Sequence, residues 1–209
     1  MVQGGETSGI SGGLSAELPP LLRLAVAYAP GPARPAWTGL VLFDHRLSCA
    51  VAGASSPLIG QLKLAWWRDR MRESASRWPK GEPLLAALAP FDGERDALEA
   101  LVDAWEGLID EEGRTDARAE LSDARAGAVA ALARTLGCAA DHDAIAALTR
   151  RWTMPDSATL ANATLAKAAL AKLRVPRALR PLVILADAPP SGAGLGALLR
   201  IVRLGMLGR

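Results

Sequence analysis

The stretch Leu58-Ile-Gly-Gln-Leu-Lys-Leu-Ala-Trp-Trp-Arg-Asp-Arg-Met-Arg72 decides the fold of this chain. After Gly60 it contains neither proline nor glycine, and its Leu, Ala, Met, Gln, Lys and Arg residues favour the α-helix. We expect a helix that begins near Ser56 and Pro57, with the serine as N-cap and the proline at the first helical position. We expect this helix to end near Arg77.

Apolar side chains cover roughly two thirds of the circumference of this helix, at about 100° per residue. A surface helix needs a narrower arc, so we expect this helix to be central. Trp66 and Trp67 point into different neighbourhoods, and Lys63 and Arg70 lie between the two tryptophan rows. Either these two cations extend along the tryptophans to water, or they edge a cavity and bind an anion. The polar face consists of Gln61, Arg68 and Arg72.

The composition indicates an all-α protein. Half of the 209 residues are apolar, β-branched residues are sparse, and no segment alternates over the length of a strand. We expect a disordered leader over residues 1–15 and one helical-bundle domain of about ten helices over residues 16–209. The expected helices span residues 17–29, 36–52, 57–77, 82–88, 94–111, 116–136, 141–153, 158–173, 177–186 and 195–207. Two widely separated cysteines predict neither a disulfide framework nor a metal site.

Charge is unevenly distributed, although the net charge is only +2. Residues 92–125 contain twelve acids and four bases, whereas residues 150–209 contain ten bases and two acids. We expect either that these regions face each other or that the basic region meets an anionic surface. The basic amphipathic segment from Leu195 to Leu207 either makes peripheral membrane contact or closes the bundle with its arginines in water. No DNA- or RNA-binding motif is present, so we expect no nucleic-acid partner.

Asp44 is an acid on an apolar helix face. On a helical wheel, Trp37, Leu40 and Leu47 lie within about 60° of it, and Ser48 lies in the same arc. Burying a carboxylate costs roughly several kcal/mol of hydration free energy, which a partner must compensate. That partner is either an arginine of another helix, a helix end, or a metal or ligand in a polar-ended cavity.

Four segments resemble the opening of the squalene/phytoene synthase family. They are Leu21-Leu-Arg-Leu-Ala-Val-Ala-Tyr-Ala-Pro30, Arg34-Pro-Ala-Trp37, Leu40-Val-Leu-Phe-Asp-His-Arg-Leu47 and Gly60-Gln-Leu-Lys-Leu-Ala-Trp-Trp-Arg-Asp69. The resemblance implies an isoprenoid-synthase fold, in which paired aspartates of a DxxxD motif hold Mg²⁺ and the Mg²⁺ binds a prenyl diphosphate. It places Asp44 at the first metal-binding aspartate, and a substrate cavity beside Leu40, Lys63, Trp66, Trp67 and Arg70.

The chain departs from the family pattern in both aspartate motifs. Ser48 occupies the second position of the DxxxD motif, and a neutral hydroxyl does not replace a carboxylate at a Mg²⁺ cluster. The region expected to carry the second motif contains only Asp156, directly after Pro155. The chain is also shorter than we expect of an active member. We therefore expect a short member of the family with degenerate motifs.

Three interpretations of the function follow. The departures favour a non-catalytic protein with no cofactor, which binds a lipid or prenyl chain or a partner protein, as do the family's assembly factors for respiratory complex I. Such a protein would be cytoplasmic, in part at the inner-membrane surface. The alternative is an active Mg²⁺-dependent prenyl transferase of isoprenoid biosynthesis that condenses isoprenyl diphosphates. The third interpretation is a helical interaction module without a cavity beneath Asp44.

Overall fold

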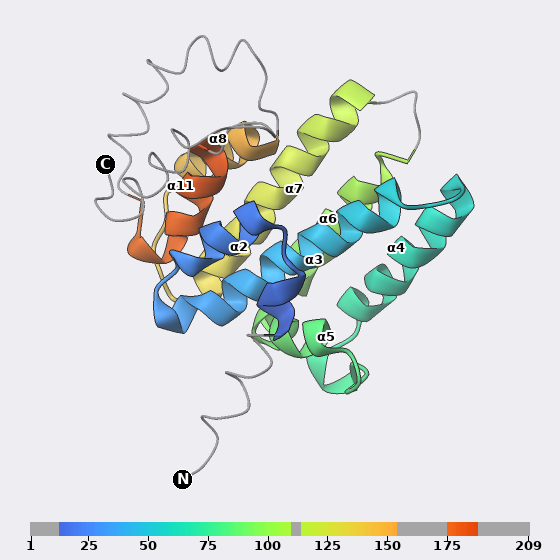
Figure 1. Cartoon of the computed structure of the whole chain (residues 1–209), viewed down its shortest axis with the longest axis horizontal. Helices are drawn as coiled ribbons and strands as arrows, with labels where there is room; N and C mark the ends of the chain where they lie inside the picture. The colour runs from blue at the N-terminus through green and yellow to red at the C-terminus, as the bar shows by residue number, and fades with distance from the viewer. Residues whose placement is uncertain (1–12, 110–113, 154–174, 188–209) are drawn as a thin grey trace.

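The computed structural model describes residues 13–109, 114–153 and 175–187, and this part of the chain is all-α, as predicted (Figure 1). Eight α-helices have both ends within these residues. They are α2 (Pro20–Ala27), α3 (Arg34–Ala52), α4 (Pro57–Arg72), α5 (Pro83–Leu88), α6 (Arg95–Glu106), α7 (Arg114–Thr135), α8 (His142–Thr153) and α11 (Arg180–Asp187). The helices predicted over residues 158–173 and 195–207, and the predicted leader up to residue 12, lie outside the described residues. No helix in the described ranges is long and apolar enough to cross a membrane.

Helix α3 is the centre of the bundle. It packs against α2, α4, α5, α6 and α7, and it is buried continuously from Ala36 to Asp44 (Figure 1). Gly39 permits the closest of these contacts, because a Cβ atom added there would lie 2.9 Å from the carbonyl oxygen of Ala87 in α5. The Trp37 indole ties α3 to the last described range, residues 175–187, by donating a 2.7 Å hydrogen bond to the carbonyl oxygen of Ala178. The buried core is therefore organised around α3.

Helix α4 lies at the edge of the bundle, so the expectation that it is central is wrong (Figure 1). Its arginines decide the orientation, because they bind the acidic side chains of α6. Arg68 Nε donates to Asp103 Oδ1 at 2.6 Å, and Arg72 Nε donates to Glu99 Oε1 at 2.6 Å. A narrow stripe is buried, comprising Gly60, Leu64, Trp67 and Met71. Part of the apolar arc faces outward as the α4 ridge, defined as Leu58, Ile59, Leu62 and Trp66, with exposed fractions of 63%, 39%, 58% and 41%.

The C-terminal end of α4 lies five residues before the expected one. The helix ends at Arg72, and the backbone of Glu73 is extended. The indole of Trp78 accounts for this end. Its Nε1 donates to the carbonyl oxygen of Arg70 at 2.6 Å and to that of Glu73 at 3.1 Å, satisfying acceptors that a continuing helix would have used.

The first predicted helix is shorter at its N-terminal end than expected. Residues 13–17 are helical, and α2 begins only at Pro20. The pair Pro19-Pro20 separates the two segments, because a residue before proline is disfavoured in the α region and Pro19 adopts ψ 149°. Proline at the first helical position of α2 needs no N–H partner.

The described residues of the acidic region contact the start of the basic region through Arg125, which stacks on Trp152 and donates to Thr153. The acids of α6 pair with the arginines of α4, and Glu94 pairs with Arg134 of α7. In the basic region, Arg151 pairs with Asp187 of the same region at 3.2 Å. Charge thus joins helices that are already neighbours, and most of the predicted basic stretch lies outside the described ranges.

Candidate functional site

Asp44 lies on the buried face of α3, as predicted, and only 5% of it is exposed. The sequence left three kinds of partner for Asp44 open, and in the structure its partner is an arginine of another helix. Arg125 of α7 donates from Nε to Asp44 Oδ1 at 3.0 Å, and its Nη2 lies 2.9 Å from Oδ2. Trp105 of α6 donates from Nε1 to Oδ1 at 2.8 Å. Oδ1 therefore accepts hydrogen bonds from α6 and α7, and Oδ2 is paired with α7.

Two tryptophans enclose the guanidinium of Arg125. Its Cζ atom lies 5.2 Å from the ring centroid of Trp105 and 4.6 Å from that of Trp152 in α8. Cation–π contacts of this kind are attractive at such distances, particularly where water is excluded. Arg125 Nη1 also donates to the hydroxyl of Thr153 at 3.3 Å. The arginine thus connects α3, α6, α7 and α8 at one point.

The void beside this cluster is small. It has a volume of about 10 Å³ and is lined by Trp37, Leu40, Val41, Asp44, Leu101, Arg125, Ala128, Val129 and Trp152. This volume is about that required by one water molecule. The void lies between α3, α6, α7 and α8 rather than between α3 and α4. Leu40 lines this void, which at about 10 Å³ is too small for an alkyl chain.

The residues at Asp44 do not fit a Mg²⁺ cluster. Magnesium requires several oxygen ligands in octahedral geometry, whereas the Asp44 oxygens already accept hydrogen bonds from Arg125 and Trp105. The hydroxyl of Ser48, at the second motif position, donates to the carbonyl oxygen of His45 at 2.6 Å. Across the three described ranges, no group of three or more His, Cys, Asp or Glu side chains is placed to hold a metal.

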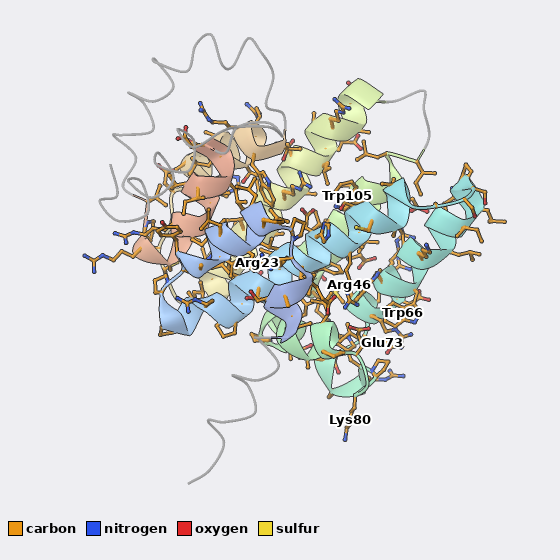
Figure 2. The ribbon with its side chains drawn as sticks, viewed as in Figure 1. Arg23, Arg46, Trp66, Glu73, Lys80 and Trp105 are labelled. Atoms are coloured by element: carbon orange, nitrogen blue, oxygen red, sulfur yellow. The ribbon has the colours of Figure 1, made fainter. Side chains whose placement is uncertain are left out.

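An open groove lies between α3 and α4, with a volume of about 400 Å³. We define this α3–α4 groove by its lining residues, which are Arg46, Cys49, Ala50, Lys63, Trp66 and Trp67. Figure 2 shows Arg46 and Trp66 on this side of the bundle. Trp67 forms the inner wall, edge-on to Phe43 with ring centroids 5.3 Å apart, and Trp66 packs edge-on against Trp67 at 4.7 Å. The two tryptophans differ in exposure, since Trp67 is buried and Trp66 is 41% exposed, but they do not point into separate neighbourhoods because both line this groove.

The cations of this region differ in their pairing. Arg46 is bound on both sides, by Glu17 Oε2 at 2.8 Å and Glu82 Oε1 at 3.1 Å. Lys63 is exposed and has no ion pair within the described residues. Arg70 does not line the groove. Its Cζ atom lies 5.9 Å from the Trp66 ring and its Nη1 lies 3.5 Å from Glu73 Oε2.

The structure therefore separates the predicted site residues into two places. Lys63, Trp66 and Trp67 come together in the α3–α4 groove, whereas Asp44 and Leu40 lie at the small void on the other side of α3. Arg125 is a functional candidate that we did not predict. It occupies the same helical face as Leu121, Ala128 and Leu132, so a search of the helical wheel for charged residues on an apolar face, which identified Asp44, would also have identified Arg125.

The fold and site define an all-α bundle with a buried Asp–Arg pair at its centre and an open, tryptophan-lined groove at its edge. No protein-family model, no curated protein and no solved structure matches this chain. Any more specific identity therefore depends on the residues themselves.

Proposed function

We propose that this chain is a squalene/phytoene-synthase-like helical protein that has lost the metal chemistry of that family and acts by binding. The observation that carries the proposal is the pairing of Asp44 with Arg125. A metal at this aspartate would have to displace the guanidinium, and breaking a buried ion pair costs about 3–5 kcal/mol. The resemblance of residues 21–72 to the family supports the isoprenoid-synthase type of bundle.

Two further observations support binding without catalysis. The void at Asp44 is water-sized, so a prenyl diphosphate would not fit beside the aspartate without rearrangement of four helices. The α3–α4 groove instead lies open at the surface and away from the aspartate. Its volume lies within the range of ligand sites, about 300–1,000 Å³.

Thermal unfolding with farnesyl diphosphate, with and without Mg²⁺, tests this proposal. We expect no Mg²⁺-dependent rise in the unfolding midpoint for the wild type. A rise without metal would indicate that the protein binds the prenyl chain and lacks the chemistry. Each midpoint is compared with that of the same protein without ligand. A Mg²⁺-dependent rise in the wild type that is absent in Asp44→Asn would overturn the proposal in favour of an active transferase.

A further inference from the structure

We infer that the α4 ridge and the adjoining α3–α4 groove form a docking surface for an acidic amphipathic helix of a partner protein. This inference rests on the proposed function, in that it gives a binding protein the surface with which it binds. The ridge residues Leu58, Ile59, Leu62 and Trp66 follow helical spacing and lie on one side of α4. From the first to the last, the ridge extends about 12 Å, or two helical turns.

The ridge is exposed because α4 is held in this orientation. Arg68 binds both Asp103 and Glu106, and Arg72 binds Glu99, so the polar face of α4 is fixed against α6. Turning the ridge inward would break these ion pairs. A contiguous apolar surface that the fold itself holds outward is typical of an interaction site.

The groove beside the ridge favours a protruding occupant over a flat one. Trp66 belongs to both features, so an apolar side chain lying along the ridge can enter the groove between Trp66 and Ala50. A helix that lays one apolar face into such a groove inserts side chains at successive turns. The volume of about 400 Å³ beside the ridge is room for such side chains.

The charge of the groove selects the kind of helix. Two cations, Arg46 and Lys63, are among its lining residues, which include no carboxylate, and Arg46 is already paired with Glu17 and Glu82. Lys63 has no ion pair within the described ranges, so it is available to a carboxylate of the partner. A second copy of this chain would bring the same cations together, because a two-fold interface uses the same patch on both subunits. The chain's own residues 150–209, with ten bases against two acids, carry the wrong charge.

The test uses two synthetic helical peptides with the same leucine face, one flanked by glutamates and the other by lysines. We expect the wild type to bind the glutamate peptide, and to bind it roughly tenfold more tightly than the lysine peptide, by fluorescence anisotropy at low salt. Leu62→Gln should weaken binding roughly tenfold, as expected of an apolar anchor. Lys63→Glu should abolish the preference for the glutamate peptide.

Lys80→Glu is the matched control, because it makes the same charge change at an exposed residue outside the groove (Figure 2). It should leave both affinities unchanged, and the urea midpoints of all variants should stay at the wild-type value. Equal binding of the two peptides, or no binding of either, would overturn the inference. So would Leu62-dependent binding to phosphatidylserine vesicles without peptide binding, or Leu62-dependent self-association in sedimentation. None of these measurements depends on farnesyl diphosphate, so each proposal can fail without the other.

Discussion

Arg125 of α7 contacts both carboxylate oxygens of Asp44 in α3, through Nε at 3.0 Å from Oδ1 and Nη2 at 2.9 Å from Oδ2. Because both side chains are almost fully buried, neither charge can return to water when the other is removed. The pair therefore couples the central helix to α7 through electrostatics as well as packing.

We expect Arg125→Met to lower the free energy of unfolding by about 3–5 kcal/mol, because it leaves Asp44 buried and without its cation. The double variant Asp44→Leu/Arg125→Met should recover most of this loss, since it removes both charges and keeps apolar volume. Urea denaturation of the two variants measures the difference. A single variant within about 1 kcal/mol of the wild type would contradict the burial of the pair.

The contact of α4 with α6 should depend on Arg68 more than on Arg72. Only 17% of the Arg68 side chain is exposed and it bridges Asp103 and Glu106, whereas 59% of the Arg72 side chain is exposed and it contacts Glu99. We expect Arg68→Gln to lower the free energy of unfolding by about 1–2 kcal/mol and Arg72→Gln by less than about 0.5 kcal/mol. Equal losses in urea denaturation would argue against the bridging role of Arg68.

Two glycines in helices should respond to alanine in opposite directions. At Gly39 an added Cβ atom would lie 2.9 Å from the Ala87 carbonyl oxygen, which is backbone and cannot move aside freely. Gly39→Ala should therefore destabilise the protein by about 1–3 kcal/mol. At Gly127, within α7, an added Cβ meets nothing within 4 Å, so Gly127→Ala should stabilise by about 0.5–1 kcal/mol. Thermal unfolding of both variants checks the signs.

The pairing of η3, the 3-10 helix Ala89–Glu94, with α7 should be sensitive to acid. Arg134 donates to Glu94 from Nε at 2.7 Å and from Nη2 at 2.6 Å, and these hydrogen bonds lower the pKa of Glu94 below its ordinary value of 4.5. Because the folded-state pKa is below the unfolded-state pKa, the stabilisation is present above about pH 4.5 and is lost as the pH falls through the lowered value.

When the pH is lowered from about 5.5 to about 3, the free energy of unfolding should accordingly fall less for Arg134→Gln than for the wild type. The difference should be small, about 0.2–1 kcal/mol, because the pair is largely at the surface. Arg150→Gln, which removes an exposed arginine of α8, controls for the change in net charge. Parallel stability–pH curves for Arg134→Gln and the wild type would contradict the role assigned to this pair.

Local sequence was sufficient to predict most helix positions. Prolines at first turns, together with Gly53 after α3 and Gly137 after α7, mark the ends where the structure has them. The predicted end of α4 was wrong because the actual end depends on the indole of Trp78, which donates a hydrogen bond to the carbonyl oxygen of Arg70 in the preceding helix. Periodicity does not report a side chain that folds back on the preceding helix.

The orientation of α4 could not be predicted from its own residues. Its apolar arc alone favours a central position, and only the acids of α6, 35 and 38 residues further along the chain, explain why Arg68 turns inward. The candidate site shows the same limit. Asp44 could be recognised as a buried acid from the wheel, but its partner Arg125 lies 81 residues further along the chain. A pattern identifies the unsatisfied charge, and tertiary structure identifies what satisfies it.

The positive charge that balances Asp44 belongs to the side chain of Arg125, so this counter-ion is covalently attached to the chain. A dissociable ion at Asp44 would make the integrity of this core depend on the ionic composition of the medium and on chelators. A tethered counter-ion is always present at full stoichiometry and cannot be exchanged. The charge balance at the centre of the bundle is thus encoded in the polypeptide and is independent of metal supply.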